Sequence, residues 1–353
     1  IKFGLNGTYD RYEERLSLDA LGVNETRFNR TERGIGVFTE YAYNDLDKLG
    51  VTLGLRLDQH NLLGLFFTPR LHLKYQILPE TTLRGSIGRG KRIPNIFSEH
   101  LNVFTTGRNI IIETGSDRPE NNAQESTGNF YGLHPEIAWN YGFSLQQKIS
   151  VGTRKMTLGF DYYRTDFERQ VVVDWEQVGS VRFYNNVGSS WAQSYQFDLS
   201  YRPWDLFDMQ LAYKYYDLST AFDSGDKRPI LTPEHRVFAN LAYELEGIRP
   251  NHPLKFDVTF NWLGNQRLPE LPQVAALYGQ SFTPTVMTLS GQITKQWGPH
   301  FDLYFGVENI GDFRQDQPII NGDQPFDSDF DSSMVYGPIF GRMWYTGMRY
   351  KFE

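Results

Sequence analysis

The chain has 353 residues, and its 35 Lys and Arg against 42 Asp and Glu give a net charge of −7. This mildly acidic balance argues against a nucleic-acid-binding protein, which would show a basic stripe, and the lack of cysteine excludes disulfides and thiolate metal sites. A mean hydropathy of −0.49, together with the lack of any apolar run of ~20 residues, excludes a transmembrane helix.

Apolar and polar residues alternate with a period of two along most of the chain, first at 51–58, where the odd positions are Val or Leu. The same pattern follows at 70–77, 194–201, 255–262 and 301–308. Because successive side chains of a strand leave on opposite faces, each segment predicts a strand between an apolar and a polar medium. A soluble β-sandwich would show similar alternation, so this pattern alone does not choose between the two.

The links between roughly fourteen such segments alternate between short and long. Short links lie near 44–48, 78–80, 150–153, 202–207, 246–253 and 297–300. Long links lie near 96–135, 169–190, 221–233, 264–282 and 314–338. Tight turns on one side and long loops on the other are typical of an outer-membrane β-barrel, with the turns periplasmic and the loops outside. No repeat of the length found in β-propellers is visible.

Aromatic residues, 15% of the chain, support a barrel because they fall on the apolar parity at two levels. The first level, beside the short turns or the chain end, contains Tyr43, Tyr75, Tyr201, Tyr243 and Tyr350. The second, near the long loops, contains Tyr141, Tyr162, Tyr215 and Trp262. Amphipathic rings gather at both interfaces of a bilayer, so two girdles around an apolar band are expected of a membrane-spanning wall.

The polar parity predicts a second set of residues, which face the lumen. Its cations would set selectivity in an open pore or pair with a plug in a closed one; those we single out are Arg56, Arg70, Lys74, Arg84 and Arg92.

Motifs that would indicate a phosphate-binding loop, a metal site or an enzyme are weak in this sequence. Residues 85–92 nearly spell a phosphate-binding loop, but Arg92 stands where Ser or Thr is required and Pro94 follows. Asp327, Asp329 and Asp331 resemble the start of a calcium loop that lacks its bidentate Glu. A solvated acidic loop is the better interpretation, with Ca²⁺ as the alternative. Otherwise we expect no metal, no cofactor and no catalytic residue, and hence no enzyme.

Five segments together resemble TonB-dependent outer-membrane receptors. They are GRGKRIPN at 88–95 with Glu99, HPE at 134–136 followed by Trp139, Tyr141 and Gly142, YRTDFERQV at 163–171, GVENIGD at 306–312, and the closing stretch 341–352. The second segment lacks the family's second Glu, and Glu353 follows the terminal aromatic.

The resemblance implies a plugged barrel of about 22 strands in the outer membrane of a Gram-negative bacterium. Residues 1–353 would then be the C-terminal part of the barrel, with the N-terminal plug, the TonB box and the early strands missing. Such receptors take up a scarce ligand, most often an iron–siderophore or cobalamin, through TonB and the proton-motive force. Their partners are TonB, outer-membrane lipid and a small molecule such as a metal chelate, and no nucleic acid.

Ligand contacts in such a receptor would come from the outer loops. The long 96–135 link supplies the candidates Phe97, Phe104, Arg108, Asn121, Asn122, Phe130 and Tyr131, because aromatic rings and Arg suit planar or anionic chelates. Two alternatives stay open: a complete smaller channel of the fatty-acid-porin type, and an outer-membrane barrel enzyme.

Overall fold

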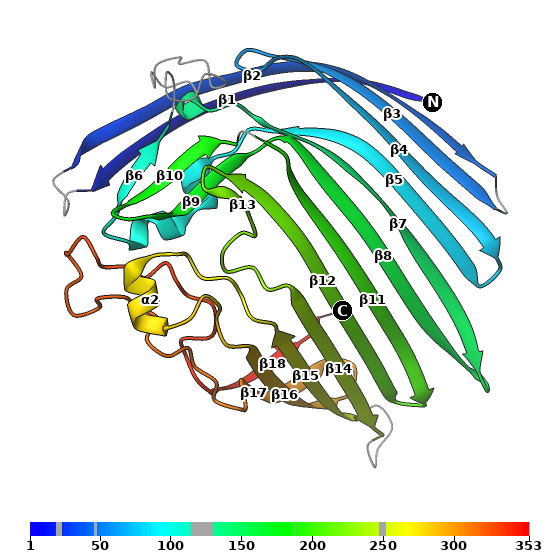
Figure 1. Cartoon of the computed structure of the whole chain (residues 1–353). Helices are drawn as coiled ribbons and strands as arrows, with labels where there is room; N and C mark the ends of the chain where they lie inside the picture. Colours follow the sequence, from blue (N-terminus) through cyan, green and yellow to red (C-terminus); the bar gives the residue numbers. More distant parts are fainter. Residues whose placement is uncertain (19–22, 46–47, 114–129, 187, 247–251, 353) are drawn as a thin grey trace.

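The computed structural model describes residues 1–18, 23–45, 48–113, 130–186, 188–246 and 252–352 (Figure 1). Fourteen strands follow one another in chain order across one sheet. They are β1 (Lys2–Leu18), β2 (Val23–Asn44), β3 (Leu49–His60), β4 (Gly64–Leu78), β5 (Thr81–Arg92), β7 (Glu136–Val151), β8 (Arg154–Arg169), β11 (Ser190–Trp204), β12 (Phe207–Phe222), β14 (His235–Leu245), β15 (Leu254–Leu263), β16 (Val286–Trp297), β17 (Phe301–Glu308) and β18 (Met343–Tyr350).

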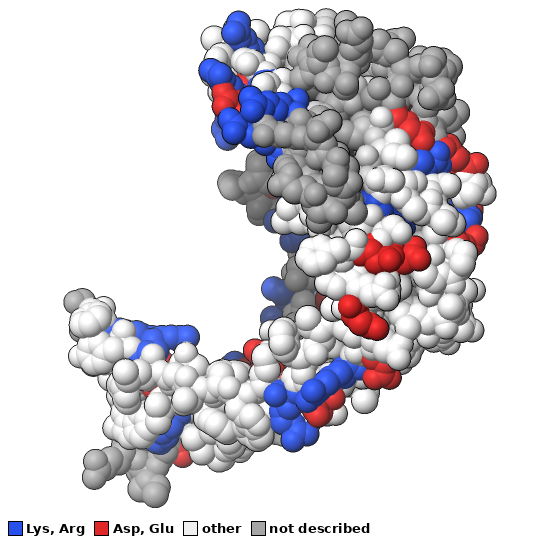
Figure 2. All heavy atoms as spheres, turned by 90° about the vertical axis from the view of Figure 1, so that its left-hand side faces the viewer, with Lys and Arg blue, Asp and Glu red and all other residues white. Residues whose placement is uncertain are grey.

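The sheet is a curved wall, with every strand antiparallel to its neighbour in the chain (Figure 1). Viewed from the loop side, the molecule is a crescent that is open on one side (Figure 2). Within the described residues, β1 pairs only with β2 and β18 only with β17, so the wall is open between them. The predicted strand number and meander are confirmed. No helix in the described part of the chain has the length and apolar character needed to cross a membrane.

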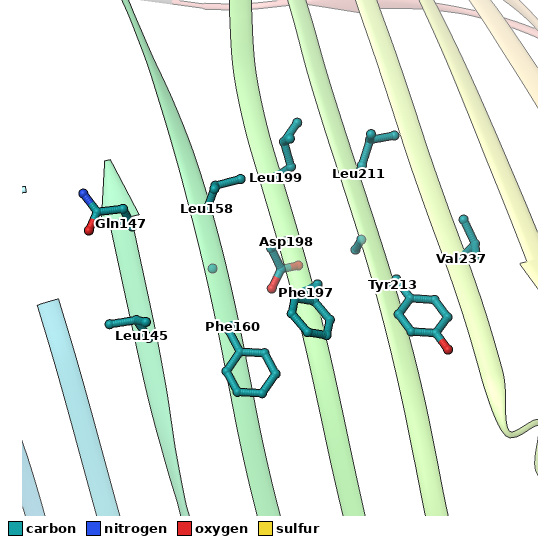
Figure 3. A pocket seen from close by; sticks show the side chains of 12 residues that line it. Leu145, Gln147, Leu158, Phe160, Phe197, Asp198, Leu199, Leu211, Tyr213 and Val237 are labelled. Carbon is teal, nitrogen blue, oxygen red and sulfur yellow. The ribbon is translucent and has the colours of Figure 1, made fainter. Parts of the chain in front are cut away.

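The outer face of the wall is apolar, as the alternation predicts. Leu71 is 39% exposed and Phe305 is 48% exposed, and neither packs in a common interior. Side chains from β7, β8, β11, β12 and β14 project from one face around a shallow depression of about 550 Å³ (Figure 3). Its lining is nearly all hydrocarbon, including Leu158, Phe197 and Leu211. A surface of this kind suits lipid, because unpaired apolar area of this extent is unfavourable in water.

The links agree with the predicted two-sided pattern, except that two links on the loop side, β1–β2 and β3–β4, are short. The β3–β4 link on the loop side is only three residues long, 61–63. Asn61 fastens this link to β2, since its side-chain oxygen accepts from the Arg33 amide at 2.7 Å and its side-chain nitrogen donates to the Thr31 carbonyl at 2.9 Å. Gly64 then takes a positive φ of 67°, which side-chain-bearing residues rarely adopt.

The buried core lies among the long loops and not inside the sheet. It is built from α1 (Ile96–Glu99), η2 (Leu101–Thr105), β6 (Asn109–Ile112), η5 (Phe130–Gly132), β9 (Val171–Gln177), β10 (Ser180–Asn185) and α2 (Pro272–Tyr278). Strands β6, β10 and β9 form a separate small sheet, and β13 (Gly225–Lys227) extends from β12. Val181, Phe183 and Met334 are fully buried there. The loops therefore form a packed layer across one end of the wall (Figure 1).

We expect a new charge to change the stability of the barrel by different amounts on the two faces of β4. We expect Leu71→Arg to lower the free energy of unfolding in lipid by about 2–4 kcal/mol, because it places a cation on the outer face near mid-strand. His72→Arg, one residue away on the inner face, is the matched control and should have little effect. Denaturant titration of the full receptor in phospholipid vesicles measures both, and equal losses would contradict the assignment of faces.

Candidate ligand-binding site at the loop side of the wall

The first long loop is docked on the inner face of β2 through three aromatic rings. Phe28 of β2 lies 5.4 Å from Phe97 and 5.2 Å from Tyr131, measured between ring centroids. The Tyr131 hydroxyl donates to Glu14 of β1 at 2.5 Å and accepts from Arg30 at 3.0 Å. Burial and the hydrogen bond to Glu14 raise the pKa of Tyr131 above its ordinary value. This loop is therefore fastened to the first two strands of the wall by both packing and hydrogen bonds.

A buried ion pair joins three of the long loops. Arg108 donates to the Asp331 carboxylate at 2.7 Å and to the Trp175 carbonyl at 2.8 Å. The Arg108 and Asp331 side chains are only 1% and 2% exposed, and a short bridge between Thr106 and Asp331 lies beside them. Removing one partner of such a pair leaves an uncompensated buried charge, which is strongly unfavourable. The pair thus holds the 93–135, 170–189 and 309–342 loops in one arrangement.

Further ion pairs extend this loop network. Arg182 of β10 contacts Glu113 at 2.6 Å, Asp174 at 2.9 Å and Asp223 at 3.0 Å. Burial would lower the pKa of Arg182, but the hydrogen bond with Asp174 and the charge of Glu113 raise it above its ordinary value. Glu176 pairs with Lys227 at 3.0 Å and also with Arg267. These contacts join different loops, so the loops at this end of the wall are held in one arrangement before any ligand binds.

Beneath the loops, the inner face carries two cations that lie over the same aromatic ring. Lys214 of β12 lies directly opposite Arg236 of β14 in the strand register. The Lys214 ammonium is 4.9 Å from the centre of the Tyr216 ring, and the Arg236 guanidinium carbon is 5.3 Å from it. Within the described residues neither cation has a carboxylate within ion-pair distance. We call Lys214, Tyr216 and Arg236 the inner-wall cation cluster.

The five cations predicted to face the lumen all lie on the concave face. Three have partners: Arg56 pairs with Asp58, Arg70 with Glu40, and Arg92 with Glu136 and Glu99. Lys74 and Arg84 lie opposite each other in the β4–β5 register, and no carboxylate of the described residues pairs with them. Lys and Arg side chains show on the hollow side in Figure 2. Whether these residues contact a plug stays a prediction.

The structure buries some of the predicted ligand-contacting residues and leaves one of them exposed. Phe97 and Tyr131 are 8% and 2% exposed, and both belong to the loop core. Arg108 is buried and paired, so its guanidinium is not available to a ligand in this arrangement. Phe104 is 38% exposed and stays a candidate. Asn121 and Asn122 lie outside the described residues, and so does the side chain of Phe130.

The acidic run near 330 does not converge on a cation position. Asp331 is occupied by Arg108 and by the Ser333 hydroxyl at 2.5 Å, whereas Asp329 is exposed. Asp327 accepts from the Asp329 amide at 2.8 Å, which is a local turn contact. In the described part of the chain, no group of three or more acidic or His side chains is arranged to hold a metal ion. The alternative of a calcium loop therefore has no geometric support.

Sequence reasoning did not single out this cluster, although the alternation along β12 could have placed Lys214 on the inner face. All three share the inner face because Lys214 and Tyr216 are two residues apart and Arg236 is the register partner of Lys214. Alternation could have placed Arg236 on the inner face. The pairing itself could not be read, since the twelve residues 223–234 separate the two strands and their length does not determine the register.

The family model described as "TonB dependent receptor-like, beta-barrel" matches residues 2–310. The chain belongs to this receptor family. The ferrienterobactin receptor of Escherichia coli is 21% identical over 242 residues, which is 65% of this chain and 30% of that protein. The ferric enterobactin receptor PirA of Pseudomonas aeruginosa is 25% identical over 141 residues, or 39% of this chain and 17% of that protein.

Solved structures show the same receptor fold. The siderophore receptor PirA of Acinetobacter baumannii aligns with a TM-score of 0.64 at 17% identity, covering 92% of this chain and 46% of that chain. A variant of the ferric enterobactin receptor PfeA of Pseudomonas aeruginosa, in complex with enterobactin, aligns with a TM-score of 0.63 at 18% identity, covering 91% and 46%. This chain thus spans less than half the length of these relatives. The expected TonB-dependent barrel is confirmed.

Asp331→Asn tests the buried ion pair. It leaves Arg108 charged and buried, so we expect it to lower the local stability of the joined loops by about 3–5 kcal/mol. Hydrogen exchange of 101–112 in the full receptor should speed up accordingly. Asp329→Asn, two residues away and exposed, should leave exchange unchanged. Added Ca²⁺ should protect neither protein, and protection of the wild-type loops by Ca²⁺ would contradict the ion-pair interpretation.

His100 predicts a pH effect on the same loop. Burial against Phe183 lowers the pKa of His100 below its ordinary value of about 6.5. The unfolded loop therefore binds the proton first, and loop stability is full above pH ~6.5 and falls as the pH drops below it. Hydrogen exchange of 96–112, corrected for its intrinsic pH dependence, should speed up between pH 7.5 and 5 in the wild type but less in His100→Gln. Identical profiles would contradict this prediction.

Proposed function

We propose that this chain forms part of an outer-membrane receptor that takes up an iron–siderophore or a related anionic metal chelate. The curated relatives named above are receptors for ferric enterobactin, and a related structure contains enterobactin. They favour a siderophore over cobalamin as the ligand. Transport in this proposal depends on TonB and on the proton-motive force, through a plug and a TonB-contacting segment of the complete receptor.

The inner-wall cation cluster is the observation that carries this proposal. Like charges directly opposite in an antiparallel pair destabilise the sheet, so Lys214 opposite Arg236 is unfavourable unless an anion approaches them. Both cations lie within cation–π distance of the Tyr216 ring, so an aromatic ring and two positive charges meet at one place on the inner face. Two cations beside a half-buried aromatic ring suit an anionic chelate with aromatic arms. Arg236 is the second residue of β14, on the side where the loops lie.

The lower cation pair fits a different role in the same proposal. Lys74 and Arg84 lie four and three residues from the Leu78–Thr81 turn, at the far end of the wall from the loops. We propose that they meet acidic groups of the plug. Further strands would close the open wall, since an edge left in hydrocarbon would expose unsatisfied backbone groups.

The two alternative functions lose support from the family membership. A complete smaller channel would not be expected to match a TonB-dependent receptor model across residues 2–310. The relatives are transport receptors, and in the described residues we find no nucleophile with a neighbouring base that favours a barrel enzyme. We therefore keep uptake, and not catalysis, as the proposed activity.

Substitution of both cations of the cluster tests the proposal. In the full receptor, Lys214→Gln with Arg236→Gln should weaken binding of ferric enterobactin by about tenfold or more, because two charge-assisted contacts are lost. The matched control is Lys74→Gln with Arg84→Gln, which removes a like pair from the same face at the opposite end. Its affinity should equal that of the wild type. Fluorescence titration of the purified receptors measures all three.

Two outcomes would contradict the proposal. Wild-type receptor that binds neither ferric enterobactin nor other ferric siderophores would reject the ligand class. Equal affinity in the wild type and the Lys214/Arg236 variant would reject the cluster as the site.

A further inference from the structure

The ladder between β4 and β5 ends before the strands do. It runs from the turn to Arg70 opposite Gly88 and does not continue past that pair. The next residue of β4 is Pro69, which has no N–H to extend the ladder. From there towards the loops, Gly64–Pro69 pairs with β3 alone, while Arg89–Arg92 pairs with β7 alone. The two strands therefore separate at their loop-side ends.

A pocket of about 460 Å³ lies where they separate. Three cations line it, Arg89 and Lys91 of β5 and Arg169 at the end of β8, together with apolar side chains that include Leu65 and Phe67. No acidic side chain is among its described lining residues. A register shift beside Ile137 sets Arg169 opposite that residue, and Lys91 lies opposite Ile137 from the other side. Two irregularities of the sheet thus bring three cations together.

The charges of this pocket are only partly balanced. Arg89 is paired with Glu168 just outside it, through two contacts of 2.6 and 3.0 Å. The Lys91 ammonium donates to the Leu63 carbonyl at 3.1 Å and lies 4.4 Å from the centre of the Phe66 ring. Within the described residues Arg169 makes no ion pair. An anion in the pocket would therefore meet two cations, Lys91 and Arg169, that form no ion pair with the described carboxylates.

The pocket opens on the outer face of the wall, at the edge of the apolar band that is nearer to the loops. On β5 the outer-face residues change from Leu83 and Ile87 to Arg89 and Lys91. On β8 they change from Phe160 and Tyr162 to Arg164. The change occurs beside the loop-side tyrosines, which mark the level where a barrel leaves the hydrocarbon. Anionic head groups of the outer leaflet lie at this level.

We propose that this pocket binds the phosphorylated head group of an anionic lipid of the outer leaflet, with the acyl chains lying against Leu57, Leu65 and Phe67. The inference rests on the proposed outer-membrane location. Phosphate oxygens satisfy Lys91 and Arg169, and the apolar lining accepts the first methylene groups of the chains. The combination of cations and apolar lining selects an amphiphile over a soluble anion.

Lipid exchange into the purified full receptor, read by native mass spectrometry, tests the proposal. The probes are lipid A, enzymatically dephosphorylated lipid A, and inorganic phosphate as a competitor. Lys91→Gln with Arg169→Gln should lower the affinity for lipid A by about tenfold. It should leave binding of dephosphorylated lipid A unchanged. Lys91→Arg with Arg169→Lys keeps the charge and should retain lipid A binding, which separates loss of charge from misfolding.

The matched control is Arg154→Gln with Lys155→Gln, which removes two cations at the turn end of the same strand β8. It should bind lipid A as the wild type does, and millimolar phosphate should not displace the lipid. Equal lipid A binding by the wild type and the Lys91/Arg169 glutamine variant would overturn the proposal, as would displacement by phosphate alone. Ferric enterobactin affinity, measured on the same preparations, should be equal in all of them. Its loss in every preparation would reject the proposed ligand and leave the lipid result standing.

Discussion

The need to satisfy every backbone hydrogen-bonding group in a medium without water underlies this structure. A strand in hydrocarbon has no partner except another strand, so the chain forms one continuous antiparallel ladder from β1 to β18. Alternation then gives one face to lipid and the other to the lumen. The outer face needs no tight packing against protein, which is why exposed Leu, Val and Phe cover it while the sheet itself contributes little to the buried core.

The loops follow a different rule, because they lie where water is present and must order themselves by packing and ion pairing. Their core contains fully buried side chains such as Val181 and Phe183. The Arg108–Asp331 pair holds together segments more than two hundred residues apart in the chain. A receptor benefits from such order, since a preformed mouth loses less conformational entropy when a ligand binds. Within the described residues, the cations of the inner-wall cation cluster form no ion pair, and in the proposed function they bind the anionic ligand.

Two irregularities in the hydrogen bonding of the sheet create the pocket between β4 and β5. A regular sheet would leave no space between β4 and β5, and Pro69 interrupts their ladder near the loops. The register shift beside Ile137 places Arg169 on the same side of the wall as Lys91. Both departures occur on the loop side of the middle of their strands, where an unsatisfied backbone group costs less the closer it lies to water.

By itself the sequence determined the strand pattern, the two faces, and the turn and loop sides, because these depend on local alternation and turn composition. The receptor family followed from the resemblance of five short segments. Arg56 and Leu71 could be assigned to their faces from parity alone. Only the tertiary structure decided that Phe97, Arg108 and Tyr131 are buried in the loop layer, and that Arg236 lies opposite Lys214. Such contacts join residues distant in sequence, and they depend on register and loop packing, which no local pattern encodes.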